Sequence, residues 1–241
     1  MVYITGDIHG NPRCIRQFCG KAGLTKDDVL VILGDVGANY HGDNRDDSVK
    51  SVLNRLEPTI FCIHGNHEMR PETIEGYVLR EWNGGQVWVQ DAYPNILFAK
   101  DGEIFTLEGQ RYIVIGGAYS VDKYYRLLRG YAWFPDEQPN AKTKAYVERR
   151  LQEEPIDIVL SHTCPYKYIP REMFIANIDQ SQVDDSTERW LDKIEDRIDY
   201  KAWYCGHWHT DKRIDRMHFL YHTFETADPA PLSDTQQEDG A

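Results

Sequence analysis

The sequence predicts an α/β fold, and three observations carry that prediction. Strongly apolar runs of four or five residues alternate with helical patterns in the first third of the chain. Runs of this kind, with no polar positions in alternation, are typical of parallel strands that are buried on both faces. Short strands separated by Gly, Asp and Pro follow, and strands alternate with helices again near the end. Together these patterns indicate a parallel sheet covered by helices, followed by antiparallel strands.

Three strands and two helices are expected before residue 70. The strands are the apolar runs at residues 2–5, 29–33 and 59–63. A helix is expected after the first strand, because Pro12 suits a first helical turn and Gly23 follows the last apolar residue at helical spacing. A second helix is expected over residues 46–56, where apolar side chains again recur at helical spacing.

The middle of the chain predicts short strands at residues 87–89, 96–98, 104–107 and 112–115. No helical pattern fits between them, so we expect an antiparallel meander. Residues 116–140 are expected to form a loop-rich region without a clear helix. The elements expected after it are a polar helix at 141–153, a strand at 156–160, a long loop to Asp185, a helix at 186–197 and a strand at 202–205.

Length and composition predict a single domain over residues 1–226. The chain has 241 residues, of which 41% are hydrophobic, and this is enough for one large core. Residues 227–241 contain acids and prolines but almost nothing apolar, so a disordered acidic tail is expected. The formal net charge of −12 disfavours nucleic acid and anionic membranes as partners and favours solubility.

Cysteine usage and the N-terminal residues predict a cytoplasmic protein. The five cysteines form no CxxC pair and are odd in number, so a disulfide framework is not expected. No signal-peptide pattern is present, and no apolar run approaches the length of a membrane span. No pattern in the sequence predicts an oligomeric state.

Five short segments near the ends of apolar runs carry side chains that bind metal ions. They are Asp7-Ile8-His9-Gly10, Gly34-Asp35, Gly65-Asn66-His67-Glu68, Ser161-His162 and Gly206-His207-Trp208-His209. Each alone has an ordinary structural explanation, such as a solvated turn, a helix-capping Asn or a hydrogen-bonded histidine. Five such segments, each at the end of a predicted strand, favour a shared site. A bridging carboxylate can hold two cations at ~3.5–4 Å, and mixed imidazole, carboxylate and amide ligands suit Mn, Fe, Zn or Co.

In order and spacing these segments resemble the motifs of the calcineurin-like metallophosphoesterase superfamily. The family pattern is Asp-x-His, Gly-Asp, Gly-Asn-His-Glu or Asp, a His after a strand, and Gly-His-x-His. The resemblance covers residues 1 to about 224. It implies a mixed-sheet β-sandwich flanked by helices, a four-layer architecture, and the hydrolysis of phosphate esters.

The resemblance also implies a role for each motif residue. It assigns one metal ion to Asp7, His9, Asp35 and His209, and a second to Asp35, Asn66, His162 and His207, so that Asp35 bridges. We expect a hydroxide between the metal ions to attack phosphorus, since no side-chain nucleophile is evident. His67 corresponds to the catalytic histidine of the family, which would protonate the leaving oxygen or stabilise charge. The alternative is that His67 only forms a hydrogen bond within its turn and has no catalytic role.

One departure from the phosphoprotein phosphatases of the same superfamily concerns the second motif. Those enzymes read Gly-Asp-x-x-Asp-Arg-Gly, whereas this chain reads Gly34-Asp35-Val36-Gly37-Ala38-Asn39-Tyr40. The Asp that pairs with the catalytic histidine and the Arg that binds phosphate are both absent there. Asp43 is a candidate for orienting His67, and Arg45 or Arg70 for binding phosphate.

Basic and aromatic residues mix between Ser120 and Pro135, where Arg126 and Arg129 are candidates for substrate binding beside Arg70. The alternative is that the aromatic residues pack a long loop onto the sheet. The sequence therefore predicts a phosphomonoesterase or protein-phosphatase-like enzyme that acts on a phosphate ester. A phosphodiesterase acting on nucleotides or nucleic acid is the alternative, and a non-catalytic metal-binding scaffold is the third possibility.

Overall fold

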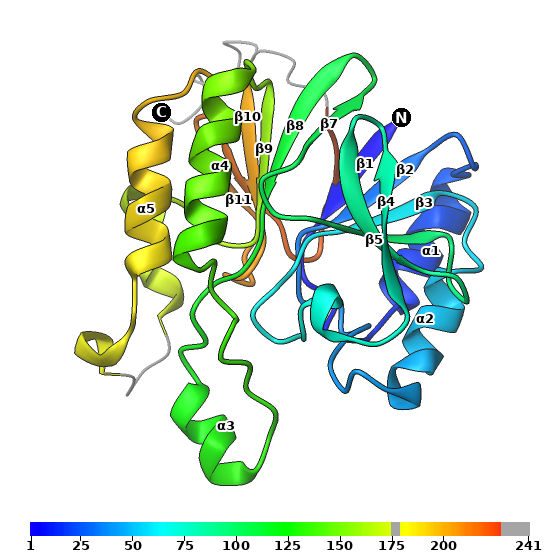
Figure 1. Cartoon of the computed structure of the whole chain (residues 1–241), viewed down its shortest axis with the longest axis horizontal. Helices are drawn as coiled ribbons and strands as arrows, with labels where there is room; N and C mark the ends of the chain where they lie inside the picture. The colour runs from blue at the N-terminus through cyan, green and yellow to red at the C-terminus, as the bar shows by residue number, and fades with distance from the viewer. Residues whose placement is uncertain (175–178, 228–241) are drawn as a thin grey trace, which may run out of the picture.

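A computed structural model describes residues 1–174 and 179–227. Two mixed β-sheets pack face to face, and helices cover the outer face of each (Figure 1). The predicted α/β β-sandwich with two mixed sheets and flanking helices is confirmed. Within the described ranges, none of the helices has the length and apolarity needed to cross a membrane.

The first sheet has seven strands in the order β13-β1-β2-β3-β6-β5-β4. Strands β1, β2, β3 and β6 are mutually parallel, and the strands at the two edges are antiparallel to their neighbours. The bounds are β1 Val2–Thr5, β2 Val29–Ile32, β3 Thr59–Cys62, β4 Tyr77–Trp82, β5 Gly85–Gln90, β6 Ile96–Ala99 and β13 Phe224–Thr226.

The second sheet has six strands in the order β11-β12-β10-β9-β8-β7. Its central strands β12, β10, β9 and β8 are parallel, with β11 and β7 antiparallel at the edges. The bounds are β7 Ile104–Leu107, β8 Gln110–Ile115, β9 Ile158–Ser161, β10 Ala202–Cys205, β11 Lys212–Ile214 and β12 Met217–Phe219. Each sheet therefore presents the carboxyl ends of several parallel strands at one edge.

Four helices form the outer layers. Helices α1 (Arg13–Ala22) and α2 (Asp47–Leu53) cover the seven-stranded sheet, and α4 (Ala141–Glu153) and α5 (Ser186–Glu195) cover the six-stranded sheet (Figure 1). Alternate residues in and directly after β2 face opposite sides of the sheet. Leu30 and Ile32 face the helices, whereas Val31 and Leu33 face the other sheet. This two-sided burial explains why the central strands read as continuous apolar runs.

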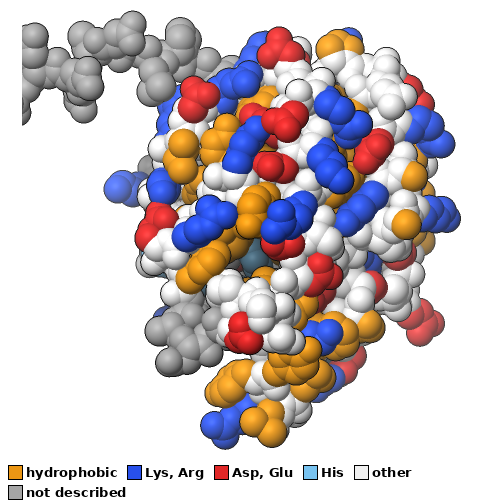
Figure 2. All heavy atoms as spheres, turned by 90° about the vertical axis from the view of Figure 1, so that its left-hand side faces the viewer, with side chains coloured by type: hydrophobic (Ala, Val, Ile, Leu, Met, Phe, Trp, Pro, Cys, Tyr) orange, Lys and Arg blue, Asp and Glu red, His pale blue; other side chains and the backbone are white. Residues whose placement is uncertain are grey.

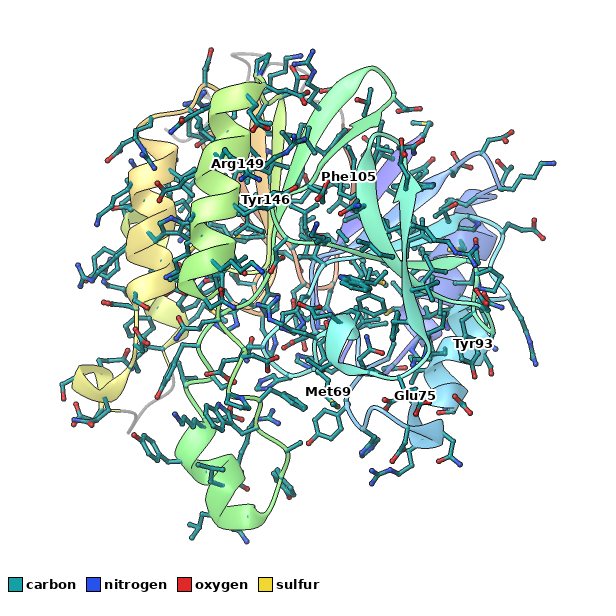
Figure 3. All side chains as sticks on the ribbon, viewed as in Figure 1. Met69, Glu75, Tyr93, Phe105, Tyr146 and Arg149 are labelled. Carbon is teal, nitrogen blue, oxygen red and sulfur yellow. The ribbon has the colours of Figure 1, made fainter. Side chains whose placement is uncertain are left out.

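Aromatic residues fill the interior between the sheets. Phe105, on β7, lies between the sheets with its side chain inaccessible to solvent (Figure 3). Its ring is perpendicular to that of Phe61 at a centroid distance of 4.9 Å and lies 5.9 Å from the ring of Trp82. Residues from both sheets thus meet in one cluster, which fixes the sandwich.

The predicted antiparallel meander is wrong in its pairing. The chain passes from one sheet to the other between β6 and β7, so that these consecutive strands are not neighbours. Strand β6 pairs in parallel with β3, and β8 pairs in parallel with β9. Only the pairs β5–β6 and β7–β8 are antiparallel hairpins of the expected kind. The apolar character of β6 and β8 on both faces is the signal of this central position.

The region 116–140, predicted to lack a clear helix, contains α3 (Lys123–Arg129). None of the residues of α3 is buried, so the apolar stripe that identifies a core-facing helix is absent. The helix lies below the sandwich in Figure 1, and Figure 2 shows apolar side chains gathered at this lower end. Tyr124, Tyr125, Leu127 and Leu128 are exposed there.

Strand β4 and the three-residue strands β11, β12 and β13 were not predicted from the sequence either. Residues 228–241 of the predicted tail lie outside the described residues. All five cysteines are free thiols, of which only Cys14 is exposed. The cytoplasmic location stays a prediction.

We expect Phe105→Ala to lower the free energy of unfolding by about 3–5 kcal/mol, because a buried aromatic ring is lost and its neighbours cannot fill the space. Tyr124→Ala is the matched control, since Tyr124 is 63% exposed, and it should change that free energy by no more than about 0.5 kcal/mol. Urea denaturation measures both. Equal effects of the two substitutions would contradict the position of Phe105 in the core.

Candidate metal centre

The five predicted ligand segments follow the carboxyl ends of five parallel strands. Strands β1, β2 and β3 end at Thr5, Ile32 and Cys62 in one sheet, and β9 and β10 end at Ser161 and Cys205 in the other. Because these ends lie at the same edge of the sandwich, side chains from distant parts of the chain come together there. Asp7, for example, accepts a hydrogen bond from the backbone amide of His207 at 2.9 Å.

Backbone strain is concentrated in these segments. Seven described non-glycine residues have a positive φ, and four of them are predicted ligands: His9 (44°), Asp35 (48°), His207 (63°) and His209 (49°). Such conformations cost about 1–3 kcal/mol each and persist where the surrounding structure holds them. The last segment is therefore a turn, which was one of the two conformations considered from the sequence.

One group of ligand atoms comes from Asp7, His9 and His209. These atoms all lie within 4.8 Å of one another. The Nε2 atoms of His9 and His209 are 2.8 Å apart, and Asp7 Oδ2 lies 3.3 Å from His209 Nε2 and 3.7 Å from His9 Nε2. Asp7 Oδ2 is buried and accepts no hydrogen bond of good geometry from the described residues. A cation among these three atoms would satisfy this buried oxygen.

A second group comes from Asn66, His162 and His207. Asn66 Oδ1 lies 2.8 Å from His162 Nε2 and 2.9 Å from His207 Nδ1. His162 Nδ1 donates a hydrogen bond to the Leu33 carbonyl at 2.6 Å, so Nε2 is the ring nitrogen directed at Asn66. Asn66 Nδ2 donates to Ser120 Oγ, which turns Oδ1 toward the histidines. The Asn66 oxygen and the imidazole nitrogens of His162 and His207 are thus close enough together to share one cation.

Asp35 lies between the two groups. Its Oδ1 is 3.7 Å from His162 Nε2, and its Oδ2 is 3.9 Å from His9 Nδ1. The backbone amide of His67 donates a hydrogen bond of 2.8 Å to Oδ1. Asp35 is buried and lies near residues of both groups, and its role as a bridging ligand stays a prediction. The residues present therefore fit divalent cations in both donor type and position.

The electrostatics favour a ligand-competent protonation state at Asp7 and His207, and a protonated ring at His209. Burial alone would raise the pKa of Asp7, but the hydrogen bond to His209 and the nearby His162 and His9 hold it well below its usual range. Burial and the neighbouring His162 lower the pKa of His207 to about 3, so this imidazole is neutral near pH 7. The hydrogen bond to Asp7 raises the pKa of His209. A carboxylate and a neutral imidazole are the forms that bind metal ions.

His67 is placed at the centre but turns its ring toward α3. Its Nε2 lies 3.1 Å from Arg126 Nη2, so the guanidinium donates and the imidazole accepts. Asp122 holds Arg126 through bonds of 2.9 Å from Nε to both carboxylate oxygens. Burial and then the positive charge of Arg126 lower the pKa of His67 to about 3. Asp122, Arg126 and His67 thus form a connected row at the site.

The other arginines considered from the sequence have their described ion pairs and ring contacts away from His67. Arg70 forms a buried ion pair with Asp101 at 2.7 Å and donates to the Asp136 carbonyl, so its contacts give no support for substrate binding. Arg129 is exposed and lies over the ring of Tyr125. Arg45 pairs with Asp43, and the contact that His67 makes is with Arg126 rather than with Asp43.

Two cavities meet at the site, and both are lined by Asp35 and His67. The first, of about 470 Å³, extends between Trp208 and the segments that follow β9 and lead into α5. The second, of about 490 Å³, extends past His9 to Arg45 and Arg126. A phosphoryl group at Asp35 and His67 would thus have space on either side.

Sequence reasoning missed Asp122 and Ser120, which support Arg126 and Asn66. Asp122 could have been found, because Asp and Arg four residues apart pair on a helix. Ser120 carries no local signal, since its contact with Asn66 joins residues 54 positions apart.

A sandwich of two mixed sheets with paired carboxylate and imidazole groups at the carboxyl ends of its strands defines a class of metal-dependent hydrolases. The profile of the calcineurin-like phosphoesterase family matches residues 1–211, so this chain belongs to that family. It is a metal-dependent phosphoesterase, and membership implies divalent metal ions and phosphate-ester hydrolysis.

One of the solved structures similar to this chain supports the fold. TT1561 of Thermus thermophilus matches with a TM-score of 0.50 at 12% identity, over 95% of this chain and 98% of that chain. Phosphopantetheinyl hydrolase from Mycobacterium tuberculosis matches with a TM-score of 0.41 at 13% identity, over 99% and 98%. The calcineurin-like phosphoesterase YfkN from Bacillus subtilis matches at 0.38 and 15%, over 87% and 72%. Among curated protein sequences there is no match.

We expect Gly34→Ala to weaken binding of Mn²⁺ by about 10–100-fold, the usual effect of disturbing the groups behind a ligand. A Cβ atom at Gly34 would lie 2.3 Å from His162 Nδ1, and the φ of 101° already disfavours alanine. Isothermal titration calorimetry measures the affinity. Gly20→Ala is the control, since a Cβ there meets nothing within 4 Å. An unchanged affinity in a folded Gly34→Ala protein would contradict the proposed position of His162.

Proposed function

We propose that this chain hydrolyses phosphate monoesters at a centre of two divalent metal ions. The observation that carries the proposal is the position of Asp35 between two groups of ligand atoms. Asp7, His9 and His209 would complete one ligand set, and Asn66, His162 and His207 the other. The imidazole, carboxylate and amide donors suit Mn, Fe, Zn or Co.

When bound, such ions would lower the pKa of bound water and offset the negative charge of the phosphoryl oxygens. The side chains of the chain then have separate tasks. Ser120 and the Leu33 carbonyl orient Asn66 and His162, which keeps their ligand atoms directed at the centre. The buried strand ends around Asp7 and Asp35 exclude bulk water, which strengthens electrostatic interactions there.

Two groups are placed to act on the phosphoryl group. His67 would protonate the leaving oxygen or stabilise charge, as predicted from its motif. Its lowered pKa leaves Nε2 without a proton near pH 7, so for proton donation the ring must first take up a proton from solvent. In the structure its Nε2 accepts a bond from Arg126, so this bond must be exchanged for one to the substrate first. Arg126 can then donate to a phosphoryl oxygen, because a guanidinium offers several N–H groups in one plane.

The pair Asp122 and Arg126 also supports a monoester as substrate. The sequence lacks an Asp-Arg pair after Gly34-Asp35, and α3 brings such a pair to His67 from another part of the chain. A guanidinium beside the site favours the second negative charge that distinguishes a monoester from a diester.

A phosphodiesterase is the second candidate, and the two cavities are the observation that favours it. A diester carries two groups on phosphorus, and Asp35 and His67 have a cavity on each side. Rates with benzyl phosphate and dibenzyl phosphate separate the candidates, since the monoesterase should prefer the first.

The proposal predicts that chelator-treated protein is inactive and that Mn²⁺ restores turnover of 4-nitrophenyl phosphate. Elemental analysis should find two ions per chain, because the ligand atoms form two groups around Asp35. Asp35→Asn should lower both the metal content and the rate, since the shared carboxylate loses its charge.

Asp91→Asn is the matched control, because Asp91 pairs with Arg80 on the surface. It should retain both metal and activity. Full turnover by metal-free protein, or by Asp35→Asn, would overturn the proposal.

We expect His67→Asn to lower kcat by about 10²–10⁴-fold, the range for loss of a general acid. Arg126→Gln should lower kcat/KM by about 10²–10³-fold, as for loss of a donor to developing charge. Steady-state kinetics with Mn²⁺-loaded proteins measure both.

Arg129→Gln is the control for Arg126, because it removes a guanidinium from the same helix that lines neither cavity. Bound metal must be unchanged in all three variants. A wild-type rate in His67→Asn would reduce His67 to a structural residue.

A further inference from the structure

The cavity beside Trp208 has a lining that indicates what the substrate carries besides phosphate. At one end it reaches Asp35, His207 and His209 of the proposed metal centre. Its walls come from residues 119–122 before α3, 166–174 after β9, and 180–188 leading into α5. A group esterified to a phosphate at the centre would extend between these walls.

Eight of the nineteen residues that line this cavity are aromatic or aliphatic. Phe174 stacks on Trp208 with ring planes at 24° and centroids 6.3 Å apart. Val121, Ile169 and Val183 also line the cavity. Phe174 is 37% exposed, so part of its apolar surface is accessible to a bound group. Covering this surface with an apolar group would remove it from water, which favours binding.

The charged residues of the same cavity are mainly acidic. Apart from Asp35, it is lined by the four carboxylates Asp122, Asp184, Asp185 and Glu188, and by one guanidinium, Arg171. Partners hold the carboxylates in place: Asp184 accepts from Gln138, Asp185 from Arg189, and Glu188 from Thr163. Arg171 lies 5.3 Å from the centre of the Tyr166 ring. Arg126 and Arg189 offset the charges of Asp122 and Asp185, and burial raises the pKa of Glu188 to about 7. Asp184 is therefore the carboxylate that would repel a second phosphate or a carboxylate on the substrate.

The cavity on the other side of the centre has the opposite character. Arg45 and Arg126 line it together with histidines. Apart from Asp35, its one lining carboxylate is Asp46, which is buried and accepts hydrogen bonds from the amides of His41 and Gly42. Anionic phosphoryl oxygens are therefore favoured toward this cavity, and the esterified group toward the cavity beside Trp208.

We infer that the substrate is a phosphate ester of an aromatic alcohol or phenol whose aromatic part carries no anionic group. This inference rests on the proposed phosphoesterase function and names the substrate class for it. The ring lies against Phe174 and Trp208, and the carboxylate of Asp184 disfavours nucleoside polyphosphates and other polyanions.

Three alkyl phosphates with similar P–O bonds test the inference: benzyl, ethyl and 4-carboxybenzyl phosphate. With Mn²⁺-loaded protein, kcat/KM for benzyl phosphate should exceed that for ethyl phosphate by about 10-fold or more, as expected for added apolar contact. The 4-carboxyl group should remove most of this advantage. Equal rates for all three esters, or preference for the carboxylated ester, would overturn the inference.

Variants locate the effect in the cavity. Phe174→Ala and Val183→Ala should lower the ratio of kcat/KM for benzyl over ethyl phosphate. Leu128→Ala is the control, because it removes an exposed apolar side chain of α3 that lines neither cavity. An unchanged ratio in both cavity variants would place the aromatic group elsewhere and overturn the inference.

Binding of non-hydrolysable phosphonates separates failure of the inference from failure of the proposed function. Calorimetry should give a lower Kd for benzylphosphonate than for ethylphosphonate, and Phe174→Ala should reduce the difference. Tight, Phe174-dependent binding without turnover of any ester would support the aromatic cavity and refute the hydrolysis. Turnover with equal Kd values would support hydrolysis and refute the aromatic cavity.

Discussion

The close packing of Asp35 against the loop after β3 is the constraint on which the site depends. A Cβ atom at Gly65 would lie 2.1 Å from Asp35 Oδ1, so only glycine allows this approach. The same oxygen accepts the backbone amide of His67. One contact therefore sets the position of a shared carboxylate and of the segment that carries Asn66 and His67. The positive φ of Asp35 is a strained backbone conformation, and the contacts with Gly65 and His67 hold it in place.

A glycine also allows a close approach to a carboxylate in the other sheet. A Cβ atom at Gly206 would lie 2.3 Å from Asp7 Oδ1, which joins the end of β10 to the end of β1. Aromatic packing around Phe105 holds the two sheets together at a distance from the site. The interior packing thus positions strand ends, and glycines beside the polar residues let those ends approach until their side chains converge.

The parts of the fold that could be predicted are those with a local signal. The central strands are apolar on both faces, and α4 and β10 have the bounds that were expected from sequence periodicity and strand patterns. The grouping of Asp7, Asp35 and Asn66 follows from their place after parallel strands of one sheet. The crossing between β6 and β7, and the exposed helix α3, could not be predicted, because sheet pairing is non-local and α3 has no buried face.

The role of Arg126 could be predicted from the sequence only in part. Its charge and aromatic surroundings suggested substrate binding, but nothing in the sequence placed its guanidinium on His67. The two members of the Asp122–Arg126 ion pair line different cavities. Asp122 lines the cavity beside Trp208, and Arg126 lines the cavity beside His9. A single ion pair therefore separates a region suited to phosphoryl oxygens from one suited to an uncharged ring. Because the two cavities meet at Asp35 and His67, the orientation of a bound ester would follow from this separation of charge before any contact specific to its ring is made.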